Sequence, residues 1–136
     1  MTSGTFLKAF GTAGTGDGQF QAPDGIAVDK YGAVYVTDFQ NNTVQMFSSE
    51  GTFNKKWGGA GTGNGQFTSP HGICCDSNGH IFVSDKSCRI QKFSPAGDFV
   101  LGWGSSGSGD GQFTDPSGIC SDSSGNIYVA DCGNSR

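Results

Sequence analysis

Asp24, His71 and Ser117 are the residues of this chain whose types could do chemistry and whose settings single them out. Each lies between a proline and a glycine, in three stretches that otherwise resemble one another. A carboxylate and an imidazole can bind a metal or move a proton, and a hydroxyl can donate a hydrogen bond. We predict a binding site at these three residues and no catalytic residue.

A metal site is the alternative for the same place, with His71 and Asp24 as its candidate ligands. Zinc takes about three protein ligands at a catalytic site, and the chain offers one histidine and one aspartate here. We therefore predict no metal and no cofactor. The glycine-rich run at residues 14–18 suggests a phosphate-binding loop, but such a loop opens a helix, whereas a strand pattern follows here.

These residues belong to a repeat of 47 and 46 residues. A period of about 40 to 50 residues that holds several short strands is typical of propeller-type arrays. Most conspicuous residues recur once per unit, which indicates structural roles. The predicted structural residues are the linker phenylalanines, the aspartates that close each second strand, and two arginines: Phe20, Phe67, Phe113, Asp38, Asp85, Asp131, Arg89 and Arg136.

Within one unit, a turn at 22–25 leads into apolar and β-branched runs at 26–28, 33–38, 43–47 and 52–57. Such runs, separated by Gly, Asn and Asp, predict strands joined by tight turns. We expect a four-stranded antiparallel meander with the apolar first strand innermost and the lysine-bearing fourth strand at the outer edge. Residues 5–10 align with a fourth strand.

The third unit, like the chain as a whole, resembles the NHL repeat. It contains Pro116-Ser117-Gly118-Ile119, Asp122, the run at 125–131, and Gly133-Asn134-Ser135-Arg136. The resemblance implies a β-propeller of four-stranded blades, most often six. It also implies that the closing aspartate pairs with the following arginine, as Asp85 with Arg89 and Asp131 with Arg136. Thr43 departs from this pattern, because the family prefers arginine there.

The predicted fold class is all-β, an arc of NHL blades covering about half of a six-bladed ring. Residues 1–20 form an outer strand plus linker, 21–67 repeat 1, 68–113 repeat 2, and 114–136 an incomplete repeat 3. Because an open arc exposes blade faces that pack on neighbours, we expect further blades in the same chain or a second copy. A fragment of a longer protein is favoured, since joining two copies would omit a third strand.

Composition bears on partners and location. The formal net charge is −4 and only 15% of residues are charged, which argues against RNA and anionic membranes, both of which reward clustered Lys and Arg. No signal peptide or bilayer-length apolar run is visible. Five cysteines, an odd number, are expected to be free thiols in a reducing compartment, and we expect a cytoplasmic protein.

The sequence therefore predicts a non-catalytic scaffold that binds a protein or peptide. The resemblance implies that it could belong to a larger protein such as a tripartite-motif ubiquitin ligase. Two alternatives remain: part of a metal-dependent propeller enzyme of the lyase or lactonase type, and an RNA-binding NHL propeller.

Overall fold

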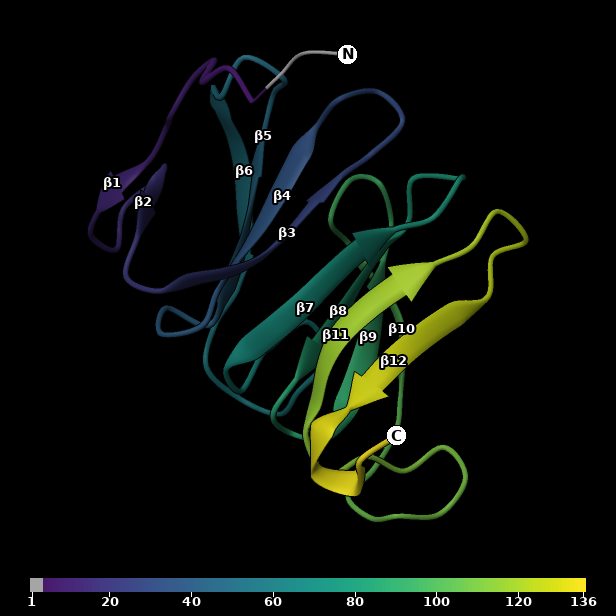
Figure 1. Cartoon of the computed structure of the whole chain (residues 1–136). Coiled ribbons are helices and arrows are strands. Elements are labelled where there is room, and N and C mark those ends of the chain that lie inside the picture. The colour runs from purple at the N-terminus through teal and green to yellow at the C-terminus, as the bar shows by residue number, and fades with distance from the viewer. Residues whose placement is uncertain (1–3) are drawn as a thin grey trace.

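The computed structural model describes residues 4–136, and its regular structure is almost entirely β. Two four-stranded antiparallel sheets precede a two-stranded one (Figure 1). The first sheet holds β3 (Pro23–Val28), β4 (Val34–Asp38), β5 (Thr43–Phe47) and β6 (Phe53–Gly58). The second holds β7 (Pro70–Cys75), β8 (Ile81–Asp85), β9 (Arg89–Phe93) and β10 (Phe99–Trp103). The third holds β11 (Pro116–Ser121) and β12 (Ile127–Asp131), followed by the 3-10 turn η1 (Cys132–Asn134).

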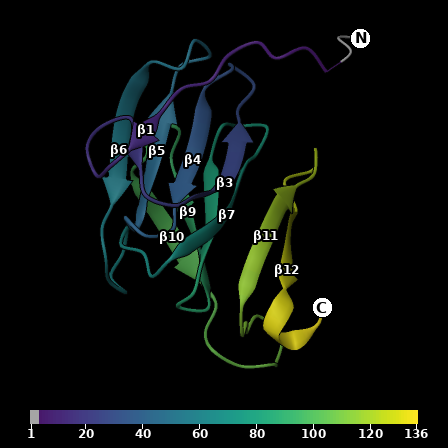
Figure 2. The same cartoon turned by 60° about the vertical axis from the view of Figure 1, so that its left-hand side comes forward.

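The strand order confirms the meander that the sequence predicts. In both complete sheets, each strand pairs with the next along the chain. The first strands of successive sheets are neighbours, since β7 packs against β3 on one side and β11 on the other. Figure 1 shows the sheets succeeding one another in chain order, and Figure 2 shows β11 and β12 apart from the other two sheets, which overlap in that view. This is the arrangement of propeller blades about an axis.

Within residues 4–136, no helix is long and apolar enough to cross a bilayer.

The expected turn at 22–25 is wrong in its extent, because the first strand already begins at Pro23. The same holds for Pro70 and Pro116. In each blade the pairing register shifts between the proline and the isoleucine three residues on. Proline lacks a donor but is tolerated at the first position of a strand. Asp24, His71 and Ser117 therefore lie on strands, in irregularly paired segments.

The expected outer strand at residues 5–10 is also wrong: residues 5–10 form no strand. Residues 1–3, which the prediction included in the same unit, lie outside the described residues. A fourth strand needs a third strand beside it to hydrogen-bond with, and the described part of the chain places none there. Instead, β1 (Thr12–Ala13) and β2 (Gln19–Phe20) form a short parallel pair.

The main core lies between the first two blades. Phe67, from the linker, is fully buried. It packs with residues from β4, β5, β7, β8 and β9, namely Tyr35, Val44, Ile73, Ile81, Val83 and Phe93. The other two linker phenylalanines, Phe20 and Phe113, are half-buried. Phe67 thus packs between the first blade and the second.

Each linker is folded by side chains that cap its backbone. The Gln66 side chain accepts a hydrogen bond from the Gly63 N–H at 3.0 Å, and Gln19 and Gln112 do the same in their own linkers. The Arg89 guanidinium donates to the carbonyl oxygens of Thr62, Gly63 and Gln66 at 2.7, 3.1 and 2.6 Å. These contacts account for the repeated glutamines, and glycines are needed beside them because a Cβ on Gly61 or Gly63 would collide with the Gln66 side chain.

Candidate functional site

Two buried hydroxyls fix the geometry at one end of the inner strands. Thr37 Oγ1 accepts a hydrogen bond from the Gly25 N–H at 2.8 Å and donates to the His71 carbonyl oxygen at 2.7 Å. In the next blade, Ser84 Oγ makes the same bonds with the Gly72 N–H at 3.0 Å and the Ser117 carbonyl oxygen at 2.7 Å. Each hydroxyl therefore ties its own blade to the inner strand of the next.

The inner strands approach one another closely at this level. A Cβ atom on Gly25 would collide with the His71 carbonyl oxygen, and one on Gly72 would collide with the Ser117 carbonyl oxygen. Glycine is required here because of this close approach of two backbones. The residues before the three glycines are thereby held side by side around one end of the propeller axis.

The structure brings the three predicted site residues together around one cavity. A cavity of about 320 Å³ is lined by Asp24, His71 and Ser117 and by the glycine that follows each of them. Its wall is therefore half side chain and half bare backbone. Such a wall can offer peptide groups as well as side chains to whatever enters.

Asp24 and His71 form a hydrogen-bonded pair. His71 Nδ1 lies 2.7 Å from Asp24 Oδ2. Since a carboxylate only accepts, the proton belongs on Nδ1, which leaves Nε2 as an acceptor in the neutral imidazole. Nε2 is buried and has no hydrogen-bond partner. The pair thus combines an exposed negative charge with an oriented ring.

A second row of side chains lies outside the first. The Phe39 ring contacts the His71 ring edge-on at 4.9 Å between centroids, and the Lys86 ammonium lies 5.3 Å from the Phe39 ring centroid. In the third blade, Cys132 Sγ lies 2.9 Å from Ser117 Oγ. Phe39, Lys86 and Cys132 each follow one of the repeated aspartates directly.

These two rows together form what we call the channel-mouth face: Asp24, His71, Ser117, Phe39, Lys86 and Cys132. The second row was not predicted from the sequence. A signal was available, since this position also differs in every unit while the aspartate before it is constant. The face thus combines two positions that differ in every unit, each beside a residue that is constant.

The repeated aspartates serve the turns. Asp38 is fully buried and accepts hydrogen bonds from the N–H groups of Gln21 and Ala22 at 2.8 and 3.1 Å and from Asn41. Asp85 lies 3.4 Å from Arg89 Nε, in the arrangement that the family resemblance implies. Their lone pairs are used within the fold.

Asp131 repeats this arrangement in the third blade, where Arg136 Nε lies 3.6 Å from its carboxylate. Burial opposes its ionisation, but backbone N–H groups of Asp115 and Thr114, the Asn134 amide and the Arg136 charge outweigh that and lower the pKa of Asp131. A carboxylate held ionised by so many donors is suited to stabilising a turn, not to exchanging protons near neutral pH.

Metal binding and RNA binding find less support in the described part of the chain. Among residues 4–136, no three His, Cys, Asp or Glu residues are grouped so as to hold a metal ion. Lys55 and Lys56, on the outer strand of the first blade, pair with Asp98 and Asp17 at 3.5 and 3.0 Å. Lysines neutralised by neighbouring carboxylates contribute little to phosphate binding.

Two family models match parts of the chain. The model of the NHL repeat matches residues 113–136. A model described as a six-bladed β-propeller matches residues 31–94. The second match agrees with the four-stranded antiparallel sheets in indicating a propeller.

Solved structures show the same fold. One chain of a nidogen–laminin complex is 27% identical, with a TM-score of 0.59, over 80% of this chain and 39% of that one. Virginiamycin B lyase from Staphylococcus aureus is 18% identical, with a TM-score of 0.61, over 81% and 34%. A gluconolactonase from Xanthomonas campestris is 17% identical, with a TM-score of 0.60, over 83% and 36%. The chain thus spans little more than a third of the structures it matches.

Proposed function

We propose that this chain, a run of NHL repeats folded into blades of a β-propeller, is a non-catalytic scaffold that binds a protein or peptide at its channel-mouth face. The observation that carries the proposal is the cavity lined by Asp24, His71 and Ser117, three residues that differ in type between otherwise similar units. The repeated aspartates and glutamines are engaged in turns and linkers, whereas Asp24, His71 and Ser117 line the cavity, with Phe39 in contact with His71. Side chains that differ between repeats, held in place by a constant scaffold, are suited to recognising a partner.

The chemistry of the face suits a polypeptide. It offers a carboxylate, an imidazole, an aromatic ring with an ammonium group over it, a hydroxyl and a thiol. Mixed polar and aromatic groups around a small cavity are typical of protein recognition. A nucleic-acid surface would need a surplus of positive charge. Here the Asp24 carboxylate, which is negative, lines the cavity.

The comparisons add support of a general kind. Of the three structures compared, the one that is 27% identical comes from a complex of two proteins, nidogen and laminin. By analogy, a longer protein that contains this chain would use the propeller to select its partner. We propose a cytoplasmic protein such as a tripartite-motif ubiquitin ligase, in which the ligase activity would belong to other domains.

The experiment is a binding selection with matched variants. The chain is used to select peptides from a displayed random library, and the selected peptides are titrated against His71→Ala, Lys86→Ala and Tyr31→Ala. Tyr31 is 78% exposed and lies in the turn after β3, at the opposite end of that strand. We expect the first two variants to weaken binding at least tenfold and Tyr31→Ala to change it less than twofold. Peptides that bind all three variants equally would refute the proposed face.

A catalytic role is the second candidate, favoured by one observation. His71 is hydrogen-bonded to a carboxylate at 2.7 Å, and a carboxylate that orients an imidazole is common where histidine binds a metal or takes a proton. Two of the similar structures are a lyase and a lactonase. Zinc or calcium retained stoichiometrically by the full-length protein after dialysis, and lost in His71→Ala, would favour this candidate over the scaffold.

A further inference from the structure

The lysines of residues 4–136 fall into two groups. One group forms ion pairs with acidic side chains and consists of Lys8, Lys55 and Lys56. The other forms none, places its ammonium groups over aromatic rings, and consists of Lys30, Lys86 and Lys92. In this second group, Lys86 belongs to the channel-mouth face, where its ammonium lies 5.3 Å from the Phe39 ring centroid. The face therefore carries a positive charge that forms no ion pair within the described chain.

Asp24 is the negative counterpart on the same face. Its side chain is 48% exposed, and its Oδ2 atom lies 2.7 Å from His71 Nδ1. A neutral imidazole donates a hydrogen bond to a carboxylate without cancelling its charge. The described lysines and arginines that form ion pairs do so with other carboxylates. Asp24 thus keeps its negative charge and has a second oxygen, Oδ1, available to a partner.

These two charges are the ends of one row of contacts. The Lys86 ammonium lies over the Phe39 ring, the Phe39 ring contacts the His71 ring, and the His71 ring is hydrogen-bonded to Asp24. Asp24 and Phe39 come from the first blade, and His71 and Lys86 come from the second. Both of these blades contain all four of their strands. The face therefore has a built-in polarity, with a cation at one end, two rings between, and a carboxylate at the other end.

Backbone hydrogen bonds hold the second-row residues of this row in place. The Phe39 N–H donates to the Ala22 carbonyl oxygen at 2.9 Å, and the Lys86 N–H makes the same bond with the Thr68 carbonyl oxygen at 2.8 Å. Each bond joins the residue after a second strand to the segment just before the first strand of the same blade. The order of the charges is therefore set by the fold, because each charged side chain projects from an anchored backbone position.

The cavity beside Asp24 suits one long side chain. Its volume of about 320 Å³ lies at the lower end of the range for ligand pockets, which is about 300–1,000 Å³. Three glycines contribute to its lining, so that part of the wall is backbone that a side chain can approach closely. Lysine and arginine pack their aliphatic stems along such surfaces while their charged ends stay at polar groups. A basic side chain therefore complements this cavity in both charge and shape.

We propose that the channel-mouth face recognises a polypeptide segment that carries a basic and an acidic side chain a few residues apart. The basic side chain enters the cavity and pairs with Asp24, and the acidic side chain pairs with Lys86. This inference rests on the proposed scaffold function and names the chemistry of its partner. Complementary charges select partners, because a segment that places like charges together at either end of the row is repelled.

The test measures pairwise coupling with peptides that the full chain selects from the displayed random library. We expect the selected peptides to share a basic and an acidic residue at a fixed spacing. Replacing the basic residue by glutamine, or Asp24 by asparagine, should each weaken binding about fivefold or more, and both changes together should cost no more than either alone, because they remove the same ion pair. The acidic residue and Lys86→Gln should behave in the same way. Losses that add within these matched combinations would overturn the proposal.

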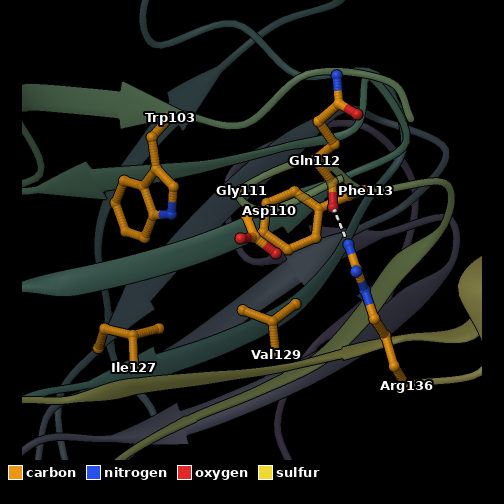
Figure 3. Close-up of a pocket in the computed structure, with 8 residues that line it drawn as sticks. All are labelled: Trp103, Asp110, Gly111, Gln112, Phe113, Ile127, Val129 and Arg136. Carbon is orange, nitrogen blue, oxygen red and sulfur yellow. Dashed lines mark hydrogen bonds between the residues drawn. The ribbon is translucent and has the colours of Figure 1, made fainter. Parts of the chain in front are cut away.

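Two matched variants serve as controls for charge alone. Asp110 is an exposed carboxylate in the last linker, beside a hollow that shares no lining residue with the channel-mouth cavity (Figure 3). Lys30 lies over the Tyr31 ring at 5.0 Å, in the turn at the far end of β3 from Asp24. We expect Asp110→Asn and Lys30→Gln to change binding less than about twofold, with circular dichroism reporting that all variants stay folded.

The same selection separates this inference from the function on which it rests. Peptides that lose binding in His71→Ala but lack the pair of opposite charges would overturn the inference and leave the channel-mouth face standing. A selection in which no peptide responds to His71→Ala would overturn both.

Discussion

Thr43 occupies in the first blade the position that Arg89 occupies in the second. Thr43 pairs with Asp38 across the strands, as Arg89 pairs with Asp85. The linker of the first blade therefore lacks a guanidinium clamp, and Thr43 Oγ1 is buried without a hydrogen-bond partner. Lys56 substitutes in part, since its ammonium donates to the Thr15 carbonyl oxygen at 3.2 Å.

This substitution predicts unequal costs of losing the two cations. Arg89→Thr should lower the free energy of unfolding by about 1.5–3 kcal/mol, because it removes several charged hydrogen bonds. Lys56→Ala should cost only about 0–1 kcal/mol, as its ion pair is partly exposed. In the background Thr43→Arg, Lys56→Ala should cost nothing measurable. Urea titrations of the four variants check this, and a larger cost for Lys56→Ala than for Arg89→Thr would contradict it.

The hydroxyl that joins the first two blades predicts a second effect. Thr37→Val keeps the shape of the side chain but leaves the Gly25 N–H and the His71 carbonyl oxygen without their partner. We expect a loss of about 1–3 kcal/mol, the cost of an unsatisfied buried polar group. Thr37→Ser, which restores the hydroxyl as Ser84 has it in the next blade, is the control. Equal stability of the Val and Ser variants in urea would show that the bridge contributes nothing.

Close approach of the inner strands predicts that equivalent glycines tolerate alanine differently. The Cβ of Gly72→Ala would collide with the Ser117 carbonyl oxygen, whereas that of Gly118→Ala would lie 3.7 Å from the nearest atom, the Cβ of Ala130. We expect Gly72→Ala to destabilise the fold by about 1–3 kcal/mol, as overpacking does, and Gly118→Ala to change stability by at most about 0.5 kcal/mol. Thermal unfolding followed by circular dichroism compares them; similar midpoints would argue against the close approach.

Asp76 predicts a pH dependence of stability. Burial alone would raise the pKa of Asp76, but hydrogen bonds from the His80 backbone and ring and from the Asn78 N–H, with the His80 charge, outweigh burial and lower it. The folded state therefore binds fewer protons than the unfolded chain. This contribution is complete above the ordinary Asp pKa of about 4 and is lost as the pH falls through the lower folded value.

We therefore expect Asp76→Asn to flatten the decline of stability between about pH 5 and pH 3, measured by urea titration at each pH. Ser77→Ala, a neutral change in the same turn, should leave the decline unchanged. An acid decline that is as steep in Asp76→Asn as in the parent would show that another group causes it.

The cysteines predict an order of chemical reactivity. Burial raises the pKa of Cys74 and of Cys75 to about 12, whereas Cys120 and Cys132 are exposed. Because the thiolate is the reactive form, N-ethylmaleimide at pH 8 should modify the two exposed thiols at least a hundredfold faster. Mass spectrometry of digests over time measures this. A peptide bound at the channel-mouth face should slow Cys132 and spare Cys120; the reverse order would contradict both the burial and the face.

The sequence was sufficient to predict the strands and their order because the relevant signals are local and occur in each unit. Strand pairing was correct in both complete blades, since alternation and turn residues such as Gly32, at φ +87°, act over a few residues. The strand expected at residues 5–10 failed for a non-local reason. Its apolar pattern is adequate, but a strand exists only beside a partner.

The candidate site was only half predictable. Asp24, His71 and Ser117 could be found because they vary between a constant proline and a constant glycine. The contact of Phe39 with His71 joins residues 32 apart in sequence and in different blades, so it depends on how one blade is rotated against the next. No local pattern encodes that rotation. The buried hydroxyl of Thr37, which fixes it, looks like an ordinary strand threonine.

The scaffold holds the inner row of the channel-mouth face by main-chain atoms. The Thr37 hydroxyl donates a hydrogen bond to the carbonyl oxygen of His71, and the Ser84 hydroxyl donates one to that of Ser117. Every amino acid possesses such an oxygen. The identity of the side chain at these places is therefore nearly uncoupled from the integrity of the ring. Substitutions at these positions can therefore change the chemistry of this surface one residue at a time while the hydrogen bonds between the blades remain.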